Sequence, residues 1–286
     1  MTIKKRRFRI FIVFLLLINL FNVKKLDAVI PYYVFPSKSN LKKQSIEIGK
    51  SAYQLLYFGQ YEEGLKLAEL AISLYKNDEK LWAILVEAQI ANKLYDKALI
   101  SIENGKRIKP KMSELFFAES SIYLKKKNIK KAKVSLLKGL ELKPENVNGI
   151  FQLGNIFLIE KEYKKALNEF NKAIIVKKNF WQAENNKGLA FYELEKKQEA
   201  INSFKKAIDI EENAEPILAL AASLGINNQN ESILLAKKAL KKDPNYLNSE
   251  YRKEQLWGEK LQKATEKLLL NNALKKDIEI AKKYLN

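Results

Sequence analysis

Apolar residues in this chain recur at helical spacing, in pairs of short stretches separated by polar turns. In the clearest pair, Ile150, Leu153 and Phe157 are three or four residues apart, so they share one face of a predicted helix. A polar turn follows, and Ala166 and Phe170 then mark the apolar face of a second predicted helix. The pattern predicts a helix–turn–helix hairpin whose two apolar faces pack together.

The hairpin recurs with a period of 34 residues. Ala98, Ala132, Ala166 and Ala200 follow one another at this step, and units begin near residues 45, 79, 113, 147, 181 and 215. A fixed period of this length is typical of stacked helical hairpins, each of which buries its apolar face against its neighbours. We therefore expect an all-α fold, an α-solenoid of about six helix–turn–helix repeats over residues 45–246. The second helix of the last unit comes two residues early, which predicts a shorter turn from Gly225 to Asn230.

Residues 247–286 follow the array and are predicted to form C-terminal capping helices. Leu256, Trp257, Leu261 and Leu268 give the segment from Leu247 to about Asn272 the pattern of one continuous amphipathic helix. An array of this kind needs a terminal helix with a polar outer face, because its last unit would otherwise leave apolar surface exposed.

The order of small and proline positions resembles that of the tetratricopeptide repeat family. The resemblance covers about residues 45–246, and the unit at 113 shows it with Ala132, Gly139 and Pro144. It implies a protein-interaction scaffold without catalytic residues or a cofactor. Three segments, 180–189, 215–221 and 254–258, resemble export-signal-bearing members of cyanobacteria and plastids. That narrower resemblance implies a role in assembling or maintaining photosynthetic membrane complexes.

In this family the first helix of each unit lines the concave face, where a partner binds. The matching positions of the units at 147 and 181 are predicted to form a groove for an extended protein segment. Amide side chains suit this place because each offers a donor and an acceptor to a peptide backbone. The alternative is that they are ordinary solvated amides of the surface. The predicted groove residues are Asn148, Phe151, Gln152, Asn155, Leu158, Gln182, Asn185, Asn186, Leu189 and Tyr192.

The N-terminus has the pattern of a targeting segment. A basic stretch from Lys4 to Arg9 overlaps an apolar run over residues 8–23. This length favours a signal peptide over residues 1–28, cleaved after Ala28, and an uncleaved membrane anchor is the alternative. Both alternatives predict that the repeats are exported across a membrane or anchored in it, and so lie in a periplasm, in a thylakoid lumen or at a membrane surface. Residues 29–44, which contain two prolines among aromatic residues, are predicted to be an extended linker.

The amino-acid composition excludes several classes of catalytic and metal-binding site. The 286-residue chain contains neither cysteine nor histidine, which excludes thiolate nucleophiles, zinc–thiolate sites and the commonest general base. Acidic pairs such as Glu62 and Glu63 are sequence neighbours in predicted turns, so they do not form a catalytic pair. We predict no enzymatic activity, no metal and no cofactor.

The net charge of +19 comes almost wholly from lysine, since only five of the 52 basic residues are arginine. Nucleic-acid binding is therefore not favoured, because arginine is the better reader of phosphates and bases. The alternative function for this charge is binding of anionic lipid headgroups or nucleic acid through the lysine-rich faces. A dense lysine run in the unit at 113 is either a solvated face or such a contact; it comprises Lys125, Lys126, Lys127, Lys130, Lys131, Lys133 and Lys138.

Overall fold

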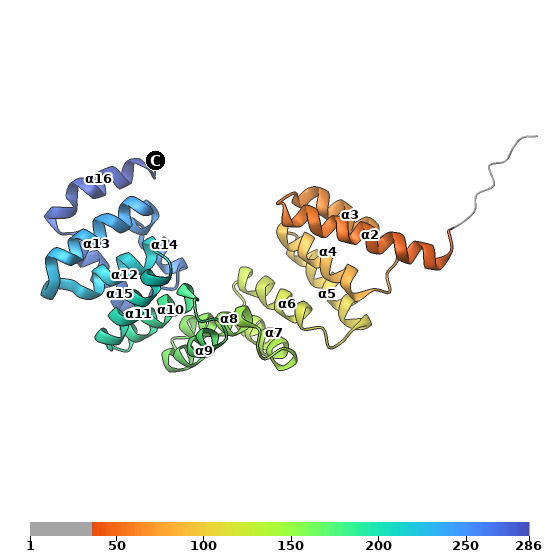
Figure 1. Ribbon diagram of the computed structural model, residues 1–286, viewed down its shortest axis with the longest axis horizontal. Coiled ribbons are helices and arrows are strands. Elements are labelled where there is room, and N and C mark those ends of the chain that lie inside the picture. The colour runs from red at the N-terminus through yellow and green to blue at the C-terminus, as the bar shows by residue number, and fades with distance from the viewer. Residues whose placement is uncertain (1–35, 286) are drawn as a thin grey trace, which may run out of the picture. The chain divides into compact units, whose positions relative to one another are not determined.

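Helices account for nearly all the regular structure of residues 36–285, the part of the chain that the computed structural model describes (Figure 1). Six consecutive helical hairpins are followed by a C-terminal segment of short helices. The hairpins are α2 (Lys38–Tyr57) with α3 (Tyr61–Leu74), α4 (Glu79–Ala91) with α5 (Tyr95–Ile108), α6 (Ser113–Lys125) with α7 (Ile129–Leu142), α8 (Val147–Ile159) with α9 (Tyr163–Val176), α10 (Trp181–Glu193) with α11 (Lys197–Ile210), and α12 (Ala214–Leu224) with α13 (Gln229–Lys242). The predicted all-α array of helical hairpins is confirmed.

The hairpin turns repeat one backbone conformation. Lys93, Lys127, Lys161 and Glu195 are 34 residues apart, and each has a left-handed φ of 56–64°. The first hairpin has Gly59 at the same step, with a φ of 77°. The residue after each of them donates its N–H to the carbonyl five residues earlier, as Leu94 does to Gln89 at 2.8 Å. This closure satisfies the last carbonyls of the helix, although a lysine in this conformation carries steric strain that a glycine would not.

Small residues let the two helices of a hairpin approach closely. A Cβ added at Gly154 would overlap the ring of Phe170, and one at Gly188 would overlap the ring of Phe204. Both rings are fully buried. In each case the ring comes from the second helix of the same hairpin, α9 for Phe170 and α11 for Phe204. The glycines thus leave room for an aromatic ring between the two helix axes.

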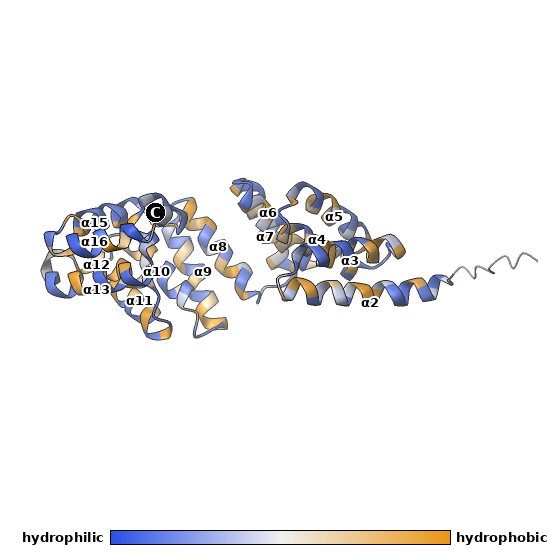
Figure 2. Ribbon diagram, turned by 90° about the horizontal axis from the view of Figure 1, so that it is seen from above, coloured by the Kyte–Doolittle hydropathy of each residue, from blue (hydrophilic) through white to orange (hydrophobic). Residues whose placement is uncertain are grey.

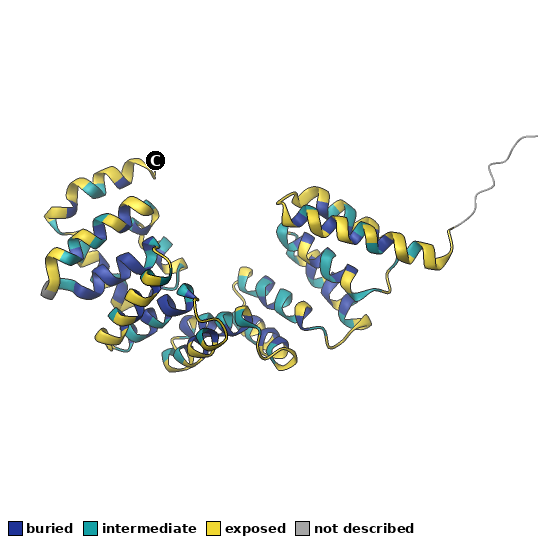
Figure 3. Ribbon diagram, in the orientation of Figure 1, coloured by how far each residue is buried: buried dark blue, intermediate teal, exposed yellow. Residues whose placement is uncertain are grey.

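The core follows the hairpins as three hydrophobic clusters. The first runs from Ala52 to Ala88, the second from Val86 to Ile122, and the third from Ala132 to Leu274. Helix α12 lies in the third cluster and is buried along most of its length (Figure 3). The other helices alternate apolar and polar stripes (Figure 2), as expected for elements with one face on a core.

The last hairpin has the shortened turn that the sequence predicts. Helix α12 ends at Leu224, the 3₁₀ turn η1 (Gly225–Asn228) follows, and α13 begins at Gln229. The step from Lys197, where α11 begins, is two residues shorter than the 34-residue period. Ser232 in α13 donates its hydroxyl to the carbonyl of Ala221 at 2.7 Å, which fixes this closer pairing.

The first helix begins earlier than the sequence suggested. An extended linker was expected over residues 29–44, but α2 starts at Lys38. The prolines that argue against helix lie at or before residue 36 and do not reach further. Ser37 caps the helix, since its hydroxyl accepts the backbone N–H of Asn40 at 3.2 Å.

The prediction of one continuous capping helix from Leu247 to Asn272 is wrong. This part of the chain consists of η2 (Pro244–Leu247), α14 (Ser249–Glu254), α15 (Glu259–Leu269), η3 (Asn272–Leu274) and α16 (Lys275–Lys283). The break has a physical cause at Leu256, whose φ of 67° reverses the chain and points Trp257 into the core. Helix α15 then packs against α10 and α12, and α16 packs against α13.

Residues 1–28, with their predicted signal or anchor, lie outside the described residues. Within residues 36–285, no helix combines the length and the apolar content that crossing a bilayer requires.

Candidate functional site

A groove of about 720 Å³ lies along the first helices of three successive hairpins, and the C-terminal segment forms its far wall. Helices α6, α8 and α10 supply most of its surface. The lining residues are Ser121, Leu124, Lys125, Lys127, Ile129, Phe151, Gln152, Asn155, Ile156, Ile159, Trp181, Gln182, Asn186, Glu215, Lys253, Glu254, Gln255 and Leu256. The volume is within the usual range for ligand pockets.

Half of the predicted groove residues line this space. They are Phe151, Gln152, Asn155, Gln182 and Asn186. These five lie on α8 and α10, the first helices of two successive hairpins, and Gln152 and Asn186 occupy equivalent positions, 34 residues apart.

The other five predicted residues lie elsewhere. Asn148 is exposed outside the groove, and Leu158 is buried beside a neighbouring cavity with Tyr163 and Trp257. Asn185 and Leu189 are buried in the core, so neither presents a free surface. Tyr192 is half-buried, and desolvation raises the pKa of its hydroxyl. None of these five lines the groove, and the burial of Asn185 and Leu189 leaves them no surface for a partner, whereas a partner contact at Asn148 or Tyr192 stays a prediction.

A chain of polar side chains joins the groove to the core. Asn186 donates to the Oδ1 of Asn155 at 2.8 Å across one repeat, and Asn185 donates to the Oδ1 of Asn186 at 3.1 Å. Asn185 also donates to Glu215 Oε1 at 2.9 Å, and Trp257 Nε1 donates to the same oxygen at 3.2 Å. Because each buried amide is held by the next, the floor of the groove is pre-organised.

Glu215 is the one groove residue with a strongly shifted acidity. Desolvation at the junction of α12 with the C-terminal segment raises its pKa to about 7. Hydrogen bonds from Asn185, Trp257 and Tyr246 oppose this rise without cancelling it. The carboxyl therefore changes charge near neutral pH, at the end of the groove where the C-terminal segment closes it.

A buried arginine holds the C-terminal wall in place. Arg252 is 1% exposed, and its Nη1 donates to the carbonyls of Tyr246 and Leu247 at 2.7 and 3.0 Å. Its Nε donates to Gln262 at 3.0 Å, which ties α14 to α15. These bonds fix the short stretch from Lys253 to Leu256 against the groove.

The end of α10 anchors α15. Glu193 Oε1 accepts the backbone N–H groups of Lys260 and Leu261, each at 3.1 Å, so its carboxylate caps the N-terminus of α15. Gly258 lies against the same carboxyl, and a Cβ there would overlap it. Lys260 also pairs with Glu195 at 2.7 Å.

The groove combines an apolar side with unpaired polar atoms. The ring of Phe151 packs against that of Phe180 with centroids 4.9 Å apart, and Trp181 lines the groove beside it. Gln152 Oε1 is buried and has no hydrogen-bond partner among residues 36–285. A buried acceptor without a donor costs about 1–3 kcal/mol, which an incoming N–H group would recover. The arrangement suits a ligand that carries both backbone amides and apolar side chains.

The lysine run of the third hairpin does not form one uniform face. Lys126 pairs with Asp96 at 2.8 Å, and Lys133 pairs with Glu160. Lys131 lies over the ring of Tyr123 at 5.4 Å. Only Lys125 and Lys127 of the run line the groove, where they add positive charge to its rim.

Sequence reasoning missed Trp181, Glu215 and the stretch from Lys253 to Leu256. Trp181 is the first residue of its helix and precedes the positions counted as groove positions. The C-terminal stretch reaches the groove through contacts with α10 and α12, which no repeat period encodes. Among residues 36–285, no three His, Cys, Asp or Glu side chains are grouped so that they could hold a metal ion.

Comparison with known proteins supports the repeat architecture. The model of the tetratricopeptide repeat family matches residues 113–146 and 184–213. The chain is similar to the structure of PilF from Pseudomonas aeruginosa, with 16% identity and a TM-score of 0.62 over 76% of this chain and 98% of PilF. It is similar to a chain of the APC/C Cut9–Hcn1 hetero-tetramer, with 14% identity and a TM-score of 0.62 over 82% of this chain and 46% of that one.

A third similar structure is MamA from Desulfovibrio magneticus, with 18% identity and a TM-score of 0.54 over 61% of this chain and 97% of MamA. At these identities the likeness is one of fold. A comparison with curated protein sequences found no match. Residues 113–146 and 184–213 are therefore similar to tetratricopeptide repeats, and residues 36–285 form a stack of helical hairpins like that of the similar structures.

Proposed function

We propose that this protein is a non-enzymatic interaction scaffold that binds an extended segment of a partner protein in the groove of α6, α8 and α10. The observation that carries the proposal is the groove itself. It places Gln152, Asn155, Gln182 and Asn186 beside the aromatic side chain of Phe151.

The chemistry of the groove fits an extended segment better than a folded surface. Amides on two successive helices can pair with the donors and acceptors of a peptide backbone. The aromatic side can then take an apolar side chain of the same segment. Glu215 and the stretch from Lys253 to Leu256 close one end, so the bound segment would run from there toward α6.

A peptide selection tests this proposal. Peptides selected from a random library on the purified repeat protein are expected to lose affinity about tenfold in Gln152→Ala and Gln182→Ala, equivalent to about 1.4 kcal/mol each. Gln198→Ala is the matched control, because Gln198 is exposed on α11. Equal loss in the control, or no loss in the groove variants, would exclude the groove as the binding surface.

The basic and apolar N-terminal segment supports a location across or on a membrane. On that basis we propose that the scaffold assists the assembly or maintenance of a membrane complex, with residues 8–23 as signal or anchor. Photosynthetic complexes are the class that the narrower sequence resemblance suggests. Fractionation of cells that express the full chain, with and without residues 1–28, tests this placement: a repeat domain that stays in the cytoplasm with both would exclude it.

A further inference from the structure

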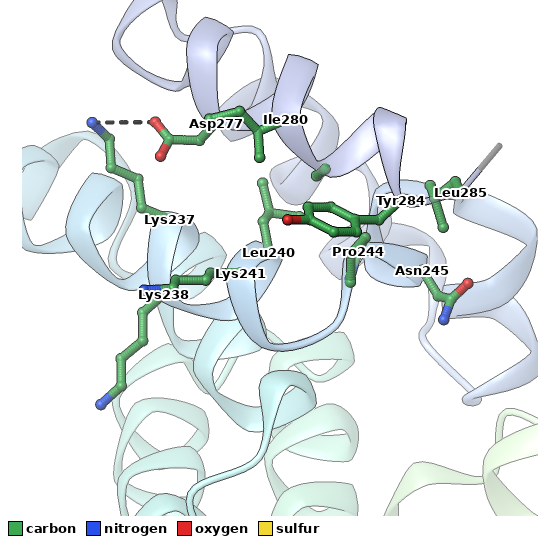
Figure 4. Close-up of a pocket in the computed structure, with 11 residues that line it drawn as sticks. Lys237, Lys238, Leu240, Lys241, Pro244, Asn245, Asp277, Ile280, Tyr284 and Leu285 are labelled. Carbon is green, nitrogen blue, oxygen red and sulfur yellow. Dashed lines mark ion pairs between the residues drawn. The ribbon is translucent and has the colours of Figure 1, made fainter.

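A second groove lies between α13 and the C-terminal helix α16, and it shares no lining residue with the α6–α8–α10 groove. It has a volume of about 820 Å³, and Figure 4 shows the residues that line it. On α13 these are Lys237, Lys238, Leu240 and Lys241, followed by Pro244 and Asn245. On α16 and just beyond it they are Asp277, Ile280, Ala281, Tyr284 and Leu285.

The spacing of these residues makes the groove elongated. Positions on α16 recur at three, four and seven residues from Asp277 to Tyr284, so they form one stripe along the helix. Seven steps of 1.5 Å give a length of about 10 Å. The groove is therefore a trough between two helices, and it suits a linear ligand.

The trough is apolar at its base and at one end. Leu240 and Ala281 are buried at the base, and the ring of Tyr284 lies between Leu240 and Pro244 (Figure 4). Tyr284 is 78% exposed and Leu285 is 43% exposed, so both leave apolar surface open to a ligand. Exposed apolar surface gathered in a concave site is typical of a binding surface.

The α13 side of the trough also carries three lysines. Lys237 pairs with Asp277 at 3.3 Å, as Figure 4 shows. Lys238 pairs with Glu212. Lys241 has no carboxylate within 4.0 Å among residues 36–285. An anion bound there would gain a charge-assisted hydrogen bond that the protein itself does not supply.

We propose that this trough binds an anionic single-chain amphiphile, with the acyl chain along Leu240, Pro244 and Tyr284 and the acidic head at Lys241. The combination of apolar side chains and a free cation matches that ligand, because a purely apolar ligand would leave Lys241 unpaired. A free phosphate or carboxylate would leave the apolar end empty. The trough shares no lining residue with the α6–α8–α10 groove, so a negative result for one binding site leaves the proposal for the other unchanged.

Calorimetric titration with monomeric dodecanoate tests the proposal on the intact chain. Wild-type protein is expected to bind one dodecanoate, and dodecyl maltoside, which has the same chain and a neutral head, is expected to bind at least tenfold more weakly. Lys241→Glu and the double substitution Tyr284→Ala with Leu285→Ala should each weaken dodecanoate binding at least tenfold. These side chains are exposed, so the fold should persist, which circular dichroism checks.

Lys205→Glu is the matched control, because Lys205 is exposed on α11 and the substitution changes the net charge equally. It should leave dodecanoate affinity within twofold of wild type. Equal loss in Lys205→Glu would overturn the site in favour of unspecific charge attraction. Binding of dodecyl maltoside as tight as that of dodecanoate would overturn the role of Lys241.

Two further probes distinguish a single-chain amphiphile from a free anion and from a membrane surface. Inorganic phosphate alone should not compete with dodecanoate, and competition would reduce the site to an anion site. Vesicles of phosphatidylglycerol that bind the protein while monomeric dodecanoate does not would make the trough a membrane contact and overturn the proposal.

Discussion

The carboxylate of Glu193 and the backbone N–H of Leu261 are 68 residues apart in sequence and lie 3.1 Å apart in the structure. This bond fastens α15 to the end of α10. It explains why the C-terminal segment folds back on the first helices of the last two hairpins, and hence why the groove has a closed end.

Removal of this cap should loosen the C-terminal wall. Glu193→Ala is expected to lower the free energy of unfolding by about 2 kcal/mol, the upper part of the range for a lost helix cap. It should also speed amide exchange throughout α15. Glu195→Ala is the control: Glu195 faces the same Lys260 from an exposed position, and its loss should leave both quantities unchanged. Urea denaturation and hydrogen–deuterium exchange measure the two effects, and equal effects of both variants would refute the capping role.

The strained turns offer a stabilising substitution. Lys93 has a φ of 59° and an exposed side chain, so Lys93→Gly should raise the free energy of unfolding by about 0.5–1 kcal/mol. The same change within α5, Lys97→Gly, should lower it by about 1 kcal/mol. Thermal and urea denaturation of the pair provide the check. Destabilisation by Lys93→Gly would show that the turn conformation carries no strain.

The contact between Gly188 and Phe204 should be intolerant of added volume. Gly188→Ala places a methyl group where the ring of Phe204 lies. We expect this substitution to lower the free energy of unfolding by about 2 kcal/mol or more. In a Phe204→Leu background the same substitution should cost clearly less, because the ring edge is gone. A double-mutant cycle by urea denaturation measures this coupling. Strict additivity would show that the two residues do not constrain each other.

Glu215 should make stability depend on pH. Its pKa is about 7 in the folded chain and 4.5 as the ordinary value, so folding favours the protonated carboxyl. The contribution of the protonated Glu215 carboxyl to the free energy of unfolding is complete below pH 4.5 and is lost as the pH rises through 7. Glu215→Gln should therefore gain stability relative to wild type between pH 5 and 8, by up to about 3 kcal/mol. Glu254→Gln, on the exposed part of the same wall, is the control, and a pH-independent difference for Glu215→Gln would contradict the shifted pKa.

The repeated part of the fold was predictable because its determinants are local. Ala132, Gly188 and Pro144 recur in register, and each reports a contact within one hairpin or with the next. The same register assigned Asn155 and Asn186 to one face, and both line the α6–α8–α10 groove. It could not show that Asn185 and Leu189 turn into the core.

The C-terminal segment was not predictable in the same way. Its leucines have helical spacing, so the pattern favours one long helix. The chain reversal depends on a left-handed Leu256 and on Glu193, which is more than 60 residues earlier. No sequence motif marks either feature. Leucine seldom adopts the left-handed conformation, so Leu256 does not predict a chain reversal. Contacts of this range decide where the groove ends.

Site-specific photo-crosslinking shows whether the α6–α8–α10 groove holds an extended partner segment. A benzoylphenylalanine is placed at Gln182 in the groove, and the matched probe is placed at Gln198 on the exposed face of α11, in cells that express the full chain. We expect the probe at position 182 to crosslink to a short contiguous stretch of one partner protein and the probe at position 198 not to crosslink. Crosslinks of equal yield from both positions, or from position 198 alone, would contradict this expectation.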